Sequence, residues 1–203
     1  MRLLHATLRQ VRLHQQLEVQ FDPRFTLLGG PNEAGKSTVV EALHKVLFLK
    51  ASATGRAVDE MRSRLHSGLP EVELSFEAAG SRWELRKRFS GASGTCQLSS
   101  DAGLALRGAA AEEQLARLLG VDGPIEGRRH SQLPLRWAHL WVRQGEAGTN
   151  LLASPSEAYD VEQLVQQLQQ RGAAAAALES PTTAWSASSC RSGSTSSSRP
   201  QAR

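Results

Sequence analysis

Gly29-Gly30-Pro31-Asn32-Glu33-Ala34-Gly35-Lys36-Ser37-Thr38 is the stretch that decides the fold of this 203-residue chain. From Gly30 to Ser37 it fits the spacing G-x-x-x-x-G-K-[ST], which is that of a phosphate-binding loop. Glycine lets backbone N–H groups approach a phosphate without a Cβ clash, and a following helix adds unpaired N–H groups and the positive end of its dipole. The pattern predicts that Lys36 binds the β- and γ-phosphates of a nucleotide and that Ser37 ligates Mg²⁺.

The residues on either side of this loop have the patterns that the motif requires. Phe25-Thr26-Leu27-Leu28 reads as a short buried strand, and apolar residues recur at helical spacing from Val39 to Leu47. We therefore predict a strand, the loop and a helix in that order, with the helix over residues 37–49. The alternative is a glycine turn that happens to carry a lysine, and the correct flanks disfavour it.

Length and composition restrict the class of protein. A chain of 203 residues is long enough for one domain with a sizeable core. Its two cysteines, Cys96 and Cys190, have no metal-binding or disulfide-framework spacing, which favours a reducing, cytoplasmic compartment. The N-terminus has no apolar run typical of a signal peptide, and no segment approaches the ~20 apolar residues of a membrane span.

The positive charge of the chain is concentrated at its C-terminal end. The net charge is +4, but residues 171–203 hold four arginines against one glutamate, which leaves residues 1–170 close to neutral. Basicity therefore gives no independent argument for a DNA-binding surface on the body of the protein.

The remaining patterns predict an α/β fold with a mixed sheet, in which the strand, loop and helix stand beside an antiparallel hairpin region. Strands are expected at Leu3–Arg9 and Leu17–Phe21, forming a small meander with residues 25–28. Apolar residues alternate with polar ones from Glu71 to Phe89, which predicts a hairpin. Further elements are expected as follows: a loop with at most one helical turn at 51–69, weaker strands at 95–99 and 104–107, and an amphipathic helix at 109–119 that ends at Gly120.

The C-terminal part of the sequence changes character. Ser154-Pro155-Ser156-Glu157 is a capping box, and it predicts a helix whose apolar stripe is either a core face or the root of a coiled coil. Residues 179–203 contain nine serines and no hydrophobic period. We therefore expect a folded domain over residues 1–178 and a disordered Ser/Arg-rich tail over 179–203. The abrupt loss of periodicity suggests the hypothesis of a truncation or a shifted reading frame after about Thr183.

The loop Gly30–Thr38, the two strands before it and Leu140-Trp141-Val142-Arg143-Gln144-Gly145-Glu146 after it resemble a known family. Over about residues 1–180 the chain looks like the N-terminal half of an SMC-like ATPase head. The SbcC-type and YhaN-type AAA ATPases, relatives of RecF and RecN, are the members it most resembles.

The resemblance implies ATP and Mg²⁺ as ligands and gives roles to individual residues. Backbone N–H groups of the run Glu33, Ala34, Gly35, Lys36, Ser37 and Thr38 would cradle phosphate oxygens, and Asn32 would point its amide at the γ-phosphate. Gln144 would contact Mg²⁺ and the attacking water, acting with Lys36 in catalysis and with Ser37 at the metal. Arg12 falls where the family keeps a basic residue near the nucleotide. From spacing alone, a surface glutamine before a turn and a solvated arginine remain the alternatives.

A complete head of this family also needs an Asp-Glu strand that supports hydrolysis and a serine-glycine signature that closes on a second nucleotide. Neither is convincing in this sequence. The resemblance therefore implies a C-terminal lobe or a second head as partner, in a homodimer or heteromer, with DNA bound through the full assembly and no membrane. DNA repair or chromosome maintenance would be the context. A non-hydrolysing regulator or truncated remnant, and a nucleotide-binding subunit of an ABC transporter, are the alternative functions.

The other clusters of chemically active residues have simpler interpretations. The six histidines show no metal spacing with the cysteines, which argues against a zinc site. Arg86-Lys87-Arg88 and Arg128-Arg129 are interpreted as solvated basic groups rather than phosphate contacts. Trp137 and Trp141 are expected to pack in the core rather than stack on bases.

Overall fold

The computed structural model describes residues 1–137, 141 and 169. All of these except Gln169 belong to one compact unit, Met1–Val165, while a second unit spans Gln166–Arg203. The helix expected after Ser154, the tail expected over 179–203 and the predicted sensor Gln144 lie outside the described residues.

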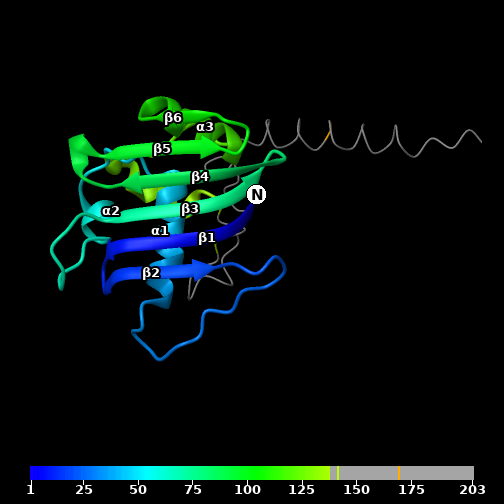
Figure 1. Cartoon of the computed structure of the whole chain (residues 1–203). Coiled ribbons are helices and arrows are strands. Elements are labelled where there is room, and N and C mark those ends of the chain that lie inside the picture. Colours follow the sequence, from blue (N-terminus) through cyan, green and yellow to red (C-terminus); the bar gives the residue numbers. More distant parts are fainter. Residues whose placement is uncertain (138–140, 142–168, 170–203) are drawn as a thin grey trace, which may run out of the picture. The chain divides into compact units, whose positions relative to one another are not determined.

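The strands of the first unit form one sheet, and its helices lie in the chain between and after these strands (Figure 1). In chain order they are β1 (Arg2–Val11), β2 (His14–Gln20), α1 (Lys36–Phe48), α2 (Arg56–Asp59), β3 (Glu71–Ala78), β4 (Ser81–Arg88), β5 (Thr95–Ser100), β6 (Ala105–Arg107) and α3 (Ala109–Leu119), with short 3₁₀ segments at Gly91–Ser93 and Gly127–Leu135.

The six described strands form one antiparallel sheet in the order β2-β1-β3-β4-β5-β6. Because side chains alternate between the two faces of a strand, each strand presents one apolar and one polar face. Helix α1 packs against β1 and β3, and α3 packs against β5 and β6, so both helices cover the apolar face (Figure 1).

The inner face of the sheet forms the core with α1. Leu74 on β3 lies opposite Ala6 on β1 and Leu85 on β4, and all three are nearly completely buried. The register continues to Leu98 on β5, which is opposite Leu85. The alternation of the hairpin sequence thus positions a continuous apolar surface against the helix that follows the phosphate loop.

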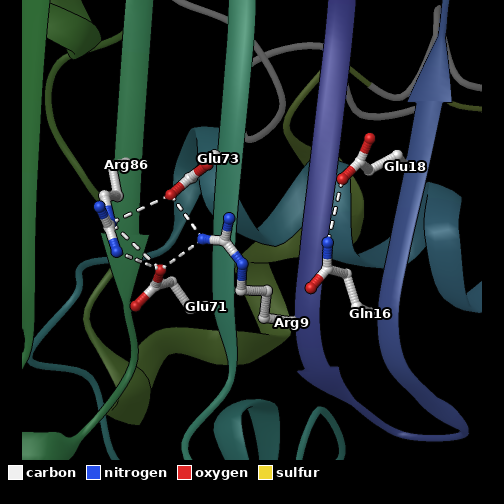
Figure 2. Close-up of polar contacts among 6 residues, drawn as sticks. All are labelled: Arg9, Gln16, Glu18, Glu71, Glu73 and Arg86. Atoms are coloured by element: carbon white, nitrogen blue, oxygen red, sulfur yellow. Dashed lines mark hydrogen bonds and ion pairs between the residues drawn. The ribbon is translucent and has the colours of Figure 1, made fainter.

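The outer face of the sheet is polar and carries a network of ion pairs (Figure 2). The Arg9 guanidinium lies 2.6 Å from a Glu73 oxygen and 3.1 Å from a Glu71 oxygen. The Arg86 guanidinium lies 2.7 Å from Glu71 and 3.2 Å from Glu73. Two cations and two carboxylates from β1, β3 and β4 are therefore linked across three strands, in the arrangement expected for opposite charges on neighbouring strands.

Several elements are confirmed with small differences in their ends. The hairpin expected over 71–89 is β3 and β4, and the helix expected over 37–49 is α1. Gly120 ends α3 in the left-handed conformation with φ 67°, as its position in the sequence predicted. The loop over 51–69 contains a single short helix, α2.

The strand predicted at Phe25–Leu28 is wrong for the described chain. These residues form no ladder, and β1 pairs with β3 in place of a third meander strand. Phe25 and Leu27 are 73% and 79% exposed. An extended segment needs a neighbouring strand for its backbone hydrogen bonds, and no described residue supplies one here.

The interpretation of Lys87 as part of a solvated basic group is also wrong. Its neighbours Arg86 and Arg88 are exposed, but Lys87 points to the inner face and is fully buried. The Lys87 ammonium donates a 2.8 Å hydrogen bond to the Leu49 carbonyl. Burial lowers the pKa of Lys87, partly opposed by the negative charge of Glu112. The strand period, not the charge of the residue, decides the side on which Lys87 lies.

The chain that follows α1 is enclosed by two glycines. A Cβ at Gly94 would collide with the Ala51 carbonyl, and a Cβ at Gly127 would collide with the Thr54 carbonyl. The same segment is bonded to Ile125, whose N–H donates to the Phe48 carbonyl at 2.7 Å. The end of α1 is therefore fixed by backbone contacts to both the β4–β5 region and the segment after α3.

Candidate nucleotide-binding site

The phosphate loop leads directly into α1, as its sequence predicted. Gly35 is the N-cap residue and adopts the left-handed conformation with φ 83°. A Cβ at this position would also collide with the His14 ring, whose Nε2 lies 3.4 Å from the Gly35 carbonyl oxygen. The left-handed backbone favours glycine here, and any larger residue would also displace the His14 ring.

The Lys36 side chain folds back over the loop. Its ammonium donates hydrogen bonds to the carbonyl oxygens of Gly30, at 2.8 Å, and Pro31, at 2.6 Å. No carboxylate among the described residues forms an ion pair with it, so its positive charge remains available to an anion at the mouth of the loop.

A cavity of about 760 Å³ opens in front of the start of α1. Its loop side is lined by Asn32, Glu33, Gly35, Lys36, Ser37 and Thr38. Its other side is lined by Arg12, Leu13, Asp59, Glu60, Arg62, Arg64 and Leu65. This volume falls within the range of ~300–1,000 Å³ typical of small-molecule and cofactor sites.

Arg12 lies at the edge of this cavity and is held from three directions. It follows β1 with φ 48°, and its guanidinium donates to the Glu60 carbonyl oxygen at 2.7 Å. It also lies 3.4 Å from the Thr38 hydroxyl and 2.8 Å from a Glu41 carboxylate oxygen. The residue chosen from the sequence as a nucleotide-side cation is thus brought against the phosphate loop.

The acidic groups around the cavity are largely paired with other cations. Asp59 lies 3.8 Å from Arg62, and Glu60 lies 2.8 Å from Arg56. Hydrogen bonding to Arg56 is the main cause that lowers the pKa of Glu60. These pairs offset negative charge at the cavity and favour binding of an anionic ligand near Lys36.

The structure brings together most of the predicted binding residues. Asn32, Glu33 and the run from Gly35 to Thr38 line the cavity, whereas Gly30 and Ala34 complete the loop without lining it. The residues that the sequence did not reveal are Leu13 and the segment 59–65. Residues 51–69 have no hydrophobic period, and long-range contacts position this segment, among them the backbone hydrogen bond from Arg12 to the Met61 carbonyl oxygen at 2.9 Å.

Two negative findings apply to the part of the chain that the structure describes. No group of three or more His, Cys, Asp or Glu residues is placed to hold a metal ion. Within those same residues, no helix has the length and apolar character needed to cross a membrane. Trp137 packs in the core, as expected, with its ring 5.4 Å from that of Phe48.

Curated relatives are found among DNA repair proteins. The DNA replication and repair protein RecF of Roseiflexus castenholzii is 42% identical over 57 residues, which are 28% of this chain and 14% of that protein. The DNA double-strand break repair Rad50 ATPase of Halobacterium salinarum is 24% identical over 164 residues, or 79% of this chain and 17% of that protein. RecF of Protochlamydia amoebophila is 29% identical over 74 residues, 36% of this chain and 21% of that protein. The chain thus spans only a small part of the length of these relatives.

Two solved structures also resemble the chain. One, from work on ATP-driven dimerisation and DNA-stimulated activation of SMC ATPases, is 18% identical with a TM-score of 0.44, over 59% of this chain and 78% of that chain. The SMC head domain from Thermotoga maritima is 23% identical with a TM-score of 0.36, over 53% of this chain and 39% of that chain.

The family follows from the sequence match rather than from these structural scores. The AAA domain family matches residues 6–135, which include the phosphate loop, the whole sheet except its first residues, and α3. The RecF and Rad50 relatives agree with the SMC-like resemblance expected from the loop. The chain belongs to the AAA domain family, and its sequence is similar to parts of RecF and Rad50 proteins.

Proposed function

We propose that this domain binds ATP with Mg²⁺ in the cavity in front of α1. The observation that carries the proposal is that the phosphate loop, the Lys36 ammonium and the Arg12 guanidinium line one cavity at the N-terminus of the 13-residue helix α1. A helix N-terminus and a glycine loop together offer backbone N–H donors and a positive dipole to phosphate groups.

The residues of the loop have the chemistry that this ligand requires. Lys36 would exchange its carbonyl contacts for the β- and γ-phosphates, and the N–H groups of Glu33 to Thr38 would bind phosphate oxygens. The Ser37 hydroxyl, at the cavity and at the start of α1, is an oxygen donor of the kind Mg²⁺ prefers, and this metal takes few protein ligands besides phosphate and water. Mg²⁺ would neutralise phosphate charge, and Gln144 would complete its surroundings.

Hydrolysis would require a second lobe. The sequence has no convincing Asp-Glu strand or serine-glycine signature, and the segment before the phosphate loop exposes Phe25 and Leu27. Large apolar side chains on an extended segment without a strand partner are typical of a surface that another polypeptide covers. We assign this surface to a C-terminal head lobe, and by analogy with the names of the relatives we place the assembly in DNA repair.

Calorimetric titration with MgATP tests the proposal. Wild-type protein is expected to bind, and Lys36→Ala to bind about ten- to a hundredfold more weakly, since a hydrogen bond to a charged group contributes ~1.5–3 kcal/mol. Lys50→Ala is the matched control, because Lys50 is a partly exposed lysine that does not line the cavity. Absence of ATP binding by the wild type, or equal affinity of the two variants, would contradict it.

The alternative function is a nucleotide-binding regulator. Such a regulator would bind ATP like an ATPase but would never hydrolyse it. Phosphate release that appears when a C-terminal lobe is added, and that Lys36→Ala removes, would establish the ATPase. Binding without turnover in the complete assembly would favour the regulator.

A further inference from the structure

The wall of the cavity opposite the phosphate loop has few backbone anchors. It runs from α2, a helix of only four residues, to Leu65, and joins the sheet through the single bridge between Val11 and Arg62. Leu65 is 68% exposed. Ala57, Val58 and Met61 anchor the inner side of this segment in the core. The side that faces the cavity has no such packing, so polar side-chain contacts fix its position beside the phosphate loop.

Lys45 supplies such a contact from α1, the helix that begins at the phosphate loop. Its side chain is 10% exposed, and its ammonium donates to the Ala57 carbonyl oxygen at 2.8 Å. The same ammonium lies 3.3 Å from a Glu60 carboxylate oxygen. Lys45 thus contacts both ends of the turn formed by α2.

Burial of this ammonium is unfavourable without its partners. Desolvation lowers the pKa of Lys45, and the charge and hydrogen bond of Glu60 act in the opposite direction. A buried cation is tolerated when it is paired and hydrogen-bonded, and both of its contacts here are on the cavity wall. The contact therefore joins the wall to α1 in one defined geometry.

Glu60 links this contact to the rest of the site. Its second carboxylate oxygen accepts a hydrogen bond from Arg56 at 2.8 Å, and its backbone carbonyl accepts one from Arg12 at 2.7 Å. Arg12 in turn contacts Thr38 in the phosphate loop. Cations from two elements, α1 and the turn after β1, therefore act together with the buried residues Ala57, Val58 and Met61 in positioning the wall.

We propose that Lys45 is a positioning residue for the nucleoside half of the nucleotide, because it holds the wall formed by residues 56–65 against the helix of the phosphate loop. This inference rests on the proposed function. If the phosphates occupy the loop side of the cavity, the ribose and base lie against the other side, where Leu13, Glu60 and Leu65 are placed. Lys45 itself does not line the cavity and acts through the wall.

Calorimetry with two ligands separates this role from general stability. MgATP needs both sides of the cavity, whereas magnesium tripolyphosphate needs only the loop side. If Lys45→Met leaves the wall in its binding geometry about a tenth of the time, apparent ATP affinity falls by about tenfold. Tripolyphosphate affinity is expected to change by less than about twofold, because the phosphate loop has its own contacts.

Matched variants complete the experiment. Lys50→Met makes the same substitution at a lysine outside the cavity and is expected to bind both ligands like the wild type. Lys45→Arg keeps the cation and is expected to recover most of the ATP affinity. Lys45→Gln removes the cation but keeps a donor for the Ala57 carbonyl oxygen and leaves the cavity lining unchanged, so it reports on the same contact if Lys45→Met fails to fold.

Selective loss of ATP affinity in Lys45→Met or Lys45→Gln supports the proposal. Unchanged ATP affinity, or an equal loss for ATP and tripolyphosphate in the folded variants, overturns it and leaves Lys45 with a purely structural role. A wild-type protein that binds tripolyphosphate and ATP equally well also overturns it, whereas a wild type that binds neither contradicts the proposed function itself.

Discussion

Residues 71–100 and residues 21–38 belong to the same compact unit but are held by different interactions. In the first region, eight registered pairs join β3 to β4 and six join β4 to β5. In the second region, Asp22 accepts backbone hydrogen bonds from Arg24 and Phe25, and Lys36 bonds to the carbonyl oxygens of its own loop. The ladder region is fixed by its backbone, and the loop region by particular side chains and glycines.

Because of this difference, single substitutions should affect stability in the first region and ligand binding in the second. A sheet with continuous ladders keeps its geometry when an exposed side chain is lost, so substitutions there act on stability through burial alone. The loop region has little buried area of its own, so substitutions there change ligand geometry with a smaller effect on the unfolding of the whole domain.

The largest expected effect is in the ladder region, at Lys87. Lys87→Ala removes a fully buried side chain, leaves the Leu49 carbonyl without its donor and removes a positive charge that interacts with Glu112. We expect a loss of about 3–5 kcal/mol in the free energy of unfolding, measured by urea denaturation. Lys87→Met should be less destabilising because it fills the same space.

Arg88→Ala, one residue further along β4 on the exposed face, is the control for Lys87→Ala. It is expected to stay within about 0.5 kcal/mol of the wild type. Similar losses of unfolding free energy in the two variants would show that burial does not decide how a substitution in the ladder region affects stability.

A smaller effect, and one on binding, is expected at Gly35. In Gly35→Ala the left-handed backbone disfavours the loop geometry by about 2 kcal/mol, which corresponds to about a thirtyfold loss of ATP affinity, and the His14 ring must also move aside. Gly80→Ala is the control, since Gly80 has φ +78° but open space around it. It should lose about 1–2 kcal/mol of stability and no affinity. Equal affinities of the two variants would contradict the assignment of the loop.

The buried thiol of Cys96 should make the stability of the ladder region depend on pH. Burial raises the pKa of Cys96 to about 11 from its usual 9.0. The unfolded chain therefore loses this proton at lower pH than the folded one, and stability falls as the pH rises from about 9 to 11. A shift of this size is worth about 3 kcal/mol in total, most of which is lost by pH 11.

Unfolding curves of the wild type and Cys96→Ala measured across that range isolate the thiol. Their difference removes the contributions of the other titrating groups that both proteins share. We expect the wild type to lose about 2 kcal/mol more than the variant by the upper end of the range. Curves that stay parallel would show that Cys96 ionises equally in both states.

The smallest effect is expected on the outer face of the sheet (Figure 2). Arg86 is 54% exposed although it contacts two carboxylates. Arg86→Met should therefore destabilise the domain by less than about 1 kcal/mol relative to Arg82→Met, whose arginine has no ion pair among the described residues. The difference should vanish near 1 M salt, where the Debye length is about 3 Å. A larger, salt-independent loss would show that this network acts as a buried one.

The parts of the fold that could be predicted are those in which sequence period and burial agree. The hairpin over 71–89 has a strict alternation, and α3 has an apolar stripe that ends at a glycine in the required conformation. The phosphate loop was predictable because its chemistry fixes residue types at fixed spacing.

The failures have physical causes that one sequence does not contain. The composition of Phe25–Leu28 is that of a buried strand. A strand also needs a neighbouring strand to accept and donate its backbone hydrogen bonds, and the residues of the segment itself do not indicate whether one is present. Lys87 lay at an inward position of the alternation, and only the structure shows the Leu49 carbonyl that makes its burial tolerable. The cavity wall of residues 56–65 is positioned by long-range contacts, among them those of Arg12 and Lys45, rather than by any local period.

Gly94 and Gly127, the two glycines that enclose the chain after α1, should restrict which residues can replace them during evolution. Any side chain at position 94 or 127 would strike a backbone carbonyl, and a backbone cannot rotate aside as a long side chain can. Among natural variants of this protein, these two positions should stay glycine while the exposed residues beside them diverge, which would make the pair a fingerprint for recognising distant members.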